Sequence, residues 1–210
     1  MYMSSDSLLA SVRQYYDEKI QTHGPTAQGV DWKSPESQQL RFAELLKLVD
    51  TSDYFTIIDY GCGYGALADY LKKLDYKFGY VGFDISSHMI SKAKCLHSNT
   101  DITFVDDERA LVTADYTVAS GIFNVKLDTP YNEWSEYVLA TLEKMNRLSK
   151  RGFAFNVLTK YSDPEFKRAD LYYADPLFYF DHCKINYSRF VSLIHDYPLY
   201  EFTISVRKEV

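Results

Sequence analysis

Long apolar runs are missing from this chain. No stretch of 18 consecutive apolar residues occurs in the 210 residues, so no transmembrane helix or membrane partner is expected. The first seven residues, Met-Tyr-Met-Ser-Ser-Asp-Ser, lack the basic and apolar regions of a signal peptide. Three cysteines, Cys62, Cys95 and Cys183, are odd in number and show no metal-ligand spacing. We therefore expect a reduced, cytoplasmic protein without a bound metal.

A surplus of positive charge is missing as well. The chain has 23 Lys and Arg against 29 Asp and Glu, a formal net charge of −6 and a pI near 5.4. It therefore offers no electrostatic footprint for nucleic acid. Low-complexity linkers and internal repeats are absent too, so residues 1–210 are expected to form a single domain.

The most informative segment runs from Ile57 to Leu71. A short apolar run ends at Asp59, three glycines follow at alternate positions (Gly61, Gly63 and Gly65), and an amphipathic helix pattern begins. Glycine lacks Cβ, so the backbone can adopt positive φ and approach a ligand closely. The following helix presents unpaired N–H groups to that ligand. The pattern predicts a strand, a tight ligand-binding turn and a helix.

Two ligand classes fit such a turn. Gly61, Gly63 and Ala66 satisfy the weaker form of the dinucleotide fingerprint Gly-x-Gly-x-x-Ala. Asp59 argues against a dinucleotide, because its carboxylate would lie close to a pyrophosphate. Gly65, which follows Gly63 after one residue, also departs from that fingerprint.

Acidic residues stand at the ends of the next two predicted strands, and the first of them points to a nucleoside. Asp84 ends the run 80–83, where a carboxylate can accept both ribose hydroxyls. An alternative is that Asp84 only caps the helix that begins near Ser86. The run 102–105 ends in Asp106 and Asp107, which could instead form a solvated acidic turn.

The stretch Asp-x-Gly-x-Gly-x-Gly, together with Asp84, resembles the class I S-adenosylmethionine-dependent methyltransferases, over roughly residues 35–208. In that family the glycine loop packs against the methionine part of the cofactor, and an acid after the third strand meets the adenine. The resemblance implies S-adenosyl-L-methionine as cofactor and assigns ten residues to it: Asp59, Gly61, Cys62, Gly63, Gly65, Asp84, Ile85, Asp106, Asp107 and Ser120.

The order of predicted elements agrees with this family. Five strand-like runs, with helical patterns between the earlier ones, imply a parallel sheet covered on both faces: 56–59, 80–83, 102–105, 115–120 and 152–159. The runs 189–194 and 201–206 are too close together for a parallel crossover and must be antiparallel. We expect an α/β three-layer sandwich, with a mostly parallel seven-stranded sheet and a C-terminal antiparallel hairpin.

The substrate side is predicted from position and aromatic content. Aromatic residues make up 16% of the chain, and they cluster in the N-terminal segment 1–33 and in the insertion 161–180. We expect the first segment to cover the site as a lid and the second to form a substrate wall. No Pro-Pro follows the fourth predicted strand, so methylation of a DNA base amine is not expected. The candidate substrate-binding residues are Tyr15, Asn124, Tyr172 and Tyr173.

The segment between the predicted lid and the first strand should be a helix. Ser34 precedes Pro35, a typical helix start, and the apolar spacing that follows marks a buried face. Trp32 and Gln38, at its beginning, could reach the cofactor. Trp32 could equally be a hydrophobic anchor for the lid.

Methyl transfer requires mainly alignment, because the sulfonium carbon is already electrophilic. An alcohol acceptor would benefit from a general base, whereas an amine only has to arrive uncharged. His23 and His182 are the candidate catalytic bases, although a histidine at such a position is more often structural. His88, His97 and His195 are weaker candidates.

Together these patterns predict methyl transfer to oxygen or nitrogen of a small polar metabolite, such as a sugar or a specialised-metabolism intermediate. The protein is expected to be a monomer or a homodimer. Two alternatives stay open. An NAD(P)-dependent oxidoreductase would need a Tyr-x-x-x-Lys pair, and Tyr15 and Lys19 have that spacing but precede the first strand. A non-catalytic scaffold would lack cofactor affinity.

Overall fold

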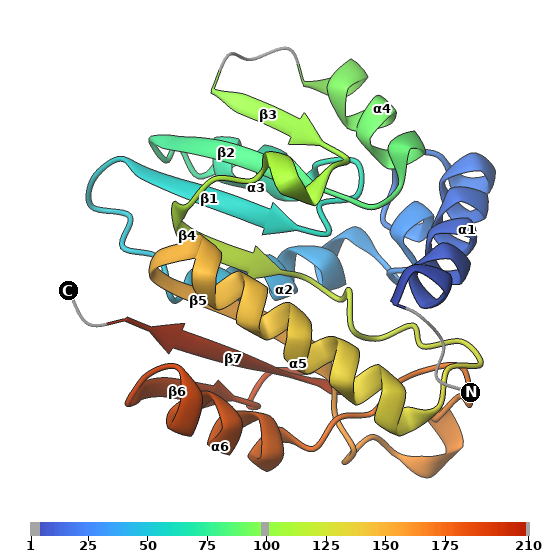
Figure 1. The fold of residues 1–210 in the computed structure, drawn as a ribbon. Helices are drawn as coiled ribbons and strands as arrows, with labels where there is room; N and C mark the ends of the chain where they lie inside the picture. The colour runs from blue at the N-terminus through green and yellow to red at the C-terminus, as the bar shows by residue number, and fades with distance from the viewer. Residues whose placement is uncertain (1–4, 98–100, 209–210) are drawn as a thin grey trace.

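A central seven-stranded sheet organises the chain in the computed structural model, which describes residues 5–97 and 101–208 (Figure 1). The strand order is β3-β2-β1-β4-β5-β7-β6. The bounds are β1 Phe55–Tyr60, β2 Phe78–Phe83, β3 Ile102–Val105, β4 Ala114–Ala119, β5 Ser149–Leu158, β6 Phe190–Ile194 and β7 Glu201–Arg207.

The pairing confirms the predicted topology. β1 to β5 are all parallel to their neighbours, and β7 pairs antiparallel with both β5 and β6. The direction in which successive strands are added to the sheet reverses at β1. β2 and β3 lie on one side of β1, and β4 and β5 lie on the other. Ligands of open α/β sheets bind outside the carboxyl ends of the strands at such a switch point.

Six α-helices are described, and five of them cover the two faces of the sheet. They are α1 Ser5–His23, α2 Pro35–Leu46, α3 Ala66–Lys73, α4 Ser87–Leu96, α5 Tyr131–Leu148 and α6 Pro176–Asn186. Figure 1 shows α5 and α6 in front of the sheet and α2 and α3 behind it. The side chains of β1 alternate accordingly: Ile58 joins the core under α5, and Ile57 joins the core under α2 and α3.

The N-terminal helix α1 covers neither face. It lies beyond the carboxyl ends of β1 and β4, next to α4 (Figure 1). A short 3-10 helix, η1 Gln28–Val30, packs against it. The predicted lid 1–33 therefore lies over the switch point, except that residues 1–4 fall outside the described part of the chain.

The predicted insertion 161–180 is divided between a loop and a helix. It contains the 3-10 helix η3 Pro164–Phe166, and α6 begins at Pro176. Two isolated bridges, Thr159 to Ala174 and Val125 to Leu171, hold the loop against its neighbours. None of the described helices has the length and apolar content needed to cross a membrane.

Candidate functional site

The glycine loop after β1 adopts the backbone that its sequence predicts. Gly61, Gly63 and Gly65 have φ of 85°, 54° and 89°, which side chains with Cβ rarely adopt. The loop lies tightly against its surroundings: a Cβ on Gly61 would come within 2.1 Å of Ile122 Cγ2, and one on Gly63 within 2.9 Å of Val30 Cγ1. The neighbouring side chains therefore leave no room for a Cβ at these two positions.

Asp84, at the end of β2, fixes this loop. One carboxylate oxygen accepts the Gly63 N–H and the other accepts the Ser86 N–H, both at 2.9 Å. The hydroxyl of Ser86, not Asp84, caps α4 by accepting the Met89 N–H. Burial raises the pKa of Asp84 to about 6. Its remaining lone pairs stay available to a ligand that brings hydroxyl donors.

Asp59, the last acid of β1, is buried beneath the loop. Its Oδ2 accepts a hydrogen bond from the Tyr80 hydroxyl at 2.7 Å, and only 3% of the residue is exposed. Burial raises the pKa of Asp59 to about 7. A cationic ligand group nearby would restore the ionised form.

A cavity at the switch point joins these acids to the N-terminal segment. The lining residues come from the glycine loop, from the ends of β1, β2 and β4, from η1 and the segment after it, and from helices α1 to α5. They are Val12, Tyr16, Val30, Trp32, Gln38, Phe42, Asp59, Tyr60, Gly61, Cys62, Gly63, Tyr64, Ala66, Phe83, Asp84, Ile85, Met89, Ser120, Gly121, Ile122 and Tyr137. Among the described residues, this lining contains no Lys, Arg or His.

Seven of the ten predicted cofactor residues line the cavity: Asp59, Gly61, Cys62, Gly63, Asp84, Ile85 and Ser120. The Ser120 hydroxyl is buried and has no hydrogen-bond partner among the described residues. A buried hydroxyl without a partner is unfavourable, so a ligand that bonded it would be stabilised. The glycine cradle, the two acids and this hydroxyl fit S-adenosylmethionine, which carries an ammonium, a ribose and an adenine.

The other three predicted cofactor residues do not line the cavity. Gly65 is the N-cap residue of α3, and a Cβ added to it would meet His97 and Phe104 at 2.8 Å. Asp106 and Asp107 are both exposed, and Asp107 forms an ion pair with Arg109 at 2.9 Å. Arg109 holds the pKa of Asp107 below its ordinary value.

Asp17, on α1, attaches the N-terminal segment to α4. Its carboxylate accepts a hydrogen bond from Ser86 and lies 3.3 Å from His88 Nδ1. A second attachment is internal to the segment, where Asp31 accepts from Tyr15 at 2.7 Å and from Lys19 at 2.6 Å. The hydroxyl of Tyr15, a predicted substrate residue, is therefore engaged with Asp31 outside the cavity lining.

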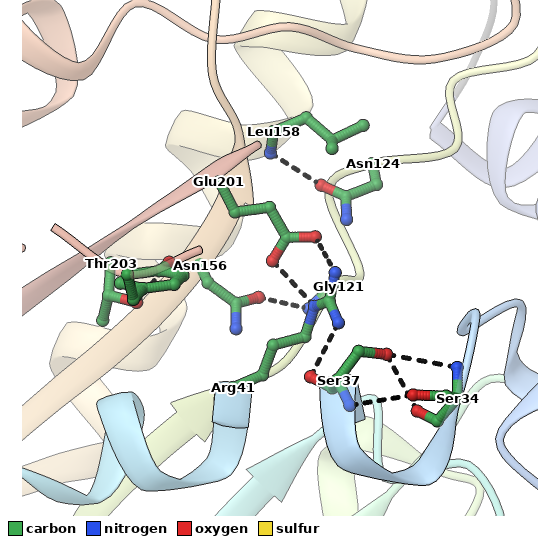
Figure 2. Close-up of polar contacts among 10 residues, drawn as sticks. Ser34, Ser37, Arg41, Gly121, Asn124, Asn156, Leu158, Glu201 and Thr203 are labelled. Carbon is green, nitrogen blue, oxygen red and sulfur yellow. Dashed lines mark hydrogen bonds and ion pairs between the residues drawn. The ribbon is translucent and has the colours of Figure 1, made fainter. Parts of the chain in front are cut away.

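Trp32 forms one wall of the cavity, and its ring contacts two residues of the surrounding structure. Its ring packs closely on Gly121, where an added Cβ would come within 2.1 Å of the ring. The Arg41 guanidinium stacks on the ring, 3.9 Å from its centroid. Arg41 in turn binds both carboxylate oxygens of Glu201 at 2.8 and 2.5 Å, as Figure 2 shows. Asn156 Oδ1 accepts the Gly121 N–H at 2.7 Å, so the backbone on which the Trp32 ring packs is also held in place.

Tyr16, Tyr60, Ile122 and Tyr137 line the cavity, although the sequence had not singled them out. The hydroxyl of Tyr60 bonds Glu108, and burial raises the pKa of Tyr137 to about 12. For Tyr16 a weak signal was present, because Val12 and Tyr16 are four residues apart and share one face of a helix. No local pattern marks Tyr137, which is 53 residues beyond Asp84.

Three predicted substrate residues have structural contacts instead of cavity contacts. Asn124 Oδ1 accepts the Leu158 N–H at 3.0 Å (Figure 2). The hydroxyl of Tyr172 is buried and bonds Tyr179 at 2.7 Å. The hydroxyl of Tyr173 accepts the Arg168 N–H at 3.0 Å.

The two predicted catalytic histidines are also distant from the lining. His23 is an exposed residue at the end of α1. His182 lies on α6, with Nε2 3.2 Å from the Tyr187 hydroxyl, and burial lowers its pKa. The structure brings neither imidazole to the cavity.

Comparison with known proteins gives a consistent result. Residues 58–155 match the family described as "Methyltransferase domain". The protein Rv1506c of Mycobacterium tuberculosis, which its name assigns to the methyltransferases, is 49% identical over 164 residues, or 78% of this chain and 99% of that protein.

Two solved structures share the fold. One is the magnesium protoporphyrin IX methyltransferase of Synechocystis PCC 6803 with bound S-adenosylmethionine, with a TM-score of 0.65 at 18% identity, covering 95% of this chain and 96% of that one. The other is human N-acetylserotonin methyltransferase in complex with S-adenosylmethionine, with a TM-score of 0.66 at 18% identity, covering 99% of this chain and 61% of that one.

Proposed function

The chain belongs to the S-adenosylmethionine-dependent methyltransferases, and from this premise we propose that its acceptor is a neutral small molecule with a hydroxyl or amine group. The oxidoreductase and scaffold alternatives are set aside by the family. The observation that supports the acceptor class is the chemistry of the cavity lining.

Within the described residues, the lining supplies hydroxyls and aromatic rings but no cationic side chain. Its polar groups are the acids Asp59 and Asp84, the amide of Gln38, the hydroxyl of Ser120 and four tyrosines. An anionic acceptor would be placed near two carboxylates without a compensating Lys or Arg, which is unfavourable in a partly buried site. A neutral acceptor with hydroxyl or amine groups can instead bond the tyrosines, and its apolar faces can pack on their rings.

The bound cofactor supplies an electrophilic methyl carbon, and the protein holds it in position. Asp84 would bind the ribose of the cofactor, and the glycine loop would lie against its methionine part. Asp59 would lie near its ammonium, whose charge favours the carboxylate form of Asp59 despite burial. Val12, Tyr16 and Trp32, all from the N-terminal segment, would exclude water from the reacting atoms.

General-base catalysis by histidine is not part of this proposal, because no imidazole lies in the lining formed by the described part of the chain. The Tyr137 hydroxyl, with a pKa raised to about 12, stays protonated near neutral pH and can donate a hydrogen bond to an acceptor. A neutral amine needs no base before the transfer. Alignment of the acceptor with the methyl group then provides most of the rate.

The test is a methyl-acceptor screen with deuterium-labelled S-adenosylmethionine, read by mass spectrometry. Neutral alcohols, phenols and amines would be compared with carboxylates and phosphate esters of similar size. Labelling confined to the neutral group supports the proposal, and labelling confined to the anionic group contradicts it. The Asp84→Asn variant is the control for product that does not come from the site.

A further inference from the structure

A second concave site lies apart from the cofactor cavity and shares no lining residue with it. It is a groove of about 430 Å³ beside the sheet edge, between the end of α2 and strands β6 and β7. Arg207 marks its position, because in the sheet register this residue is paired with Phe190 on one side and with Gly152, near the start of β5, on the other. Arg207 and Phe190 therefore lie near the amino-terminal end of β5, and from there the groove extends along β6 to Ile194.

The charged side chains that line this groove are positive, whereas the chain as a whole has a negative net charge. Lys47, Arg189 and Arg207 line it, and among the described residues the lining has no Asp or Glu. The whole chain has a formal net charge of −6. Lys47 forms an ion pair with Glu44 at 2.5 Å, but Glu44 lies outside the lining and is buried. Arg207 forms no ion pair among the described residues, so its guanidinium is the cationic group of this concavity that favours an anion.

A buried hydroxyl provides a second, independent observation. Ser205 lines the groove, only 8% of the residue is exposed, and its Oγ has no hydrogen-bond partner among the described residues. Ser192 lies directly opposite Ser205 in the β6–β7 register and also lines the groove. Buried hydroxyls normally have a partner, so a ligand oxygen in the groove would satisfy this one.

An apolar surface adjoins the charged one. The Phe190 ring is 47% exposed in the groove, and the Arg189 guanidinium lies 4.9 Å from its centroid. Leu48 and Ile194 complete this part of the lining. A ligand that combines an anionic group with an apolar part would match both surfaces.

We propose that this groove is an anion-binding site, which takes a phosphate or carboxylate group from a small ligand. Guanidinium groups bind both of these planar or tetrahedral anions through paired N–H bonds. The Ser205 hydroxyl donates to the same anion. The site is separate from the methyl-transfer cavity, and its test does not depend on methyltransferase activity.

The experiment titrates the full chain with inorganic pyrophosphate and, separately, with succinate, at an ionic strength held constant with sodium chloride. Calorimetry gives the affinity, and nitrogen-labelled NMR spectra follow the Ser192 and Ser205 amides. We expect saturable binding of one or both anions. Arg207→Gln should weaken it about tenfold, as loss of a charge-assisted bond requires. Ser205→Ala should weaken it about threefold.

Matched controls separate the groove from general charge effects. Lys73→Gln removes one positive charge from an exposed position on α3 and should leave the anion affinity unchanged. Each variant is also titrated with S-adenosylhomocysteine, which should bind all of them equally and so shows that they are folded. The proposal is overturned if neither anion saturates, or if Arg207→Gln and Lys73→Gln weaken binding to the same extent. The response to pyrophosphate or to succinate distinguishes a phosphate from a carboxylate ligand.

Discussion

The carboxylate of Asp84 accepts the Gly63 N–H at 2.9 Å, and this bond joins the end of β2 to the glycine loop that follows β1. The same carboxylate accepts the Ser86 N–H, so it also sets the start of α4. One side chain therefore positions three segments of the cofactor cavity. A ribose bound to Asp84 would be placed by the same group that shapes the loop around it.

Replacing Asp84 by Asn should weaken binding of S-adenosylhomocysteine about tenfold to a hundredfold. The amide keeps one acceptor oxygen, but its NH2 group would face a backbone N–H, and bonds to a charged acceptor are worth about 1.5–3 kcal/mol. Calorimetric titration measures the loss. Asp107→Asn is the matched control, because Asp107 is exposed and paired with Arg109. Equal losses in both variants would instead favour the predicted adenine contact of Asp107.

The raised pKa of Asp59 makes stability depend on pH. The folded protein holds the proton up to about pH 7, whereas an ordinary Asp releases it near 3.8. Between these values the folded state binds more protons, so stability falls as the pH rises. Asp59→Asn cannot titrate, and its amide oxygen can still accept from Tyr80. Without cofactor it should exceed the wild type by roughly 2–4 kcal/mol at pH 8.

That difference should disappear on acidification. At pH 4 both proteins have an uncharged group at this position, so their free energies of unfolding in urea should agree. Asp84 titrates in both proteins and cancels in the comparison. A difference that stays constant from pH 4 to pH 8 would show that Asp59 keeps an ordinary pKa in the folded protein.

Local sequence predicted the parts of the site that local structure determines. The spacing from Asp59 to Gly65 and the position of Asp84 require only a strand, a turn and the next strand. The structure brings Asp59, Gly61, Gly63 and Asp84 to one cavity, and Gly65 stays outside its lining. The mostly parallel sheet and its antiparallel hairpin followed from the alternation of elements and from the short link between β6 and β7. These features depend on residues that are close together in the sequence, so a local sequence pattern can predict them.

Such local patterns do not predict the direction in which a side chain points. Asn124 and Tyr172 follow strands as substrate residues would, yet their polar atoms bond Leu158 and Tyr179. Trp32 and Tyr137 reach the cavity from distant segments through tertiary packing. An aromatic-rich sequence does not distinguish a wall of the cavity from the core, because both positions bury the ring.

The stack of Arg41 on Trp32 predicts a coupling between the C-terminal hairpin and the cofactor cavity. Arg41→Met leaves Glu201 buried without a partner, at a cost of about 3–5 kcal/mol. Adding Glu201→Gln should recover part of this stability, because the uncompensated charge is removed.

Trp32→Ala should instead lower affinity for S-adenosylhomocysteine more than it lowers stability. Urea unfolding and calorimetry on the same four proteins measure both effects, and equal losses of affinity and stability in Trp32→Ala would contradict this assignment.

Asn124 offers a test of its structural contact against its predicted substrate role. Asn124→Ala leaves the Leu158 N–H without its acceptor, so the free energy of unfolding should fall by about 1–3 kcal/mol. The KM for an acceptor found in the screen should not change. A higher KM with unchanged stability would restore the substrate role.

Asp17 should determine how firmly the N-terminal helix stays closed over the cavity. Its carboxylate accepts from Ser86, whose Oγ in turn accepts the Met89 N–H at the start of α4, so the contact is continuous with a helix cap. Asp17→Ala removes this contact and leaves the cap in place. Amide hydrogen exchange in α1 should become faster, and S-adenosylhomocysteine should dissociate several-fold faster, because Val12 and Tyr16 line the cavity. His88→Ala is the control: His88 is 59% exposed, and an exposed ion pair contributes little, ~0–1 kcal/mol. If both variants exchange and dissociate like the wild type, the helix is held by its apolar contacts alone.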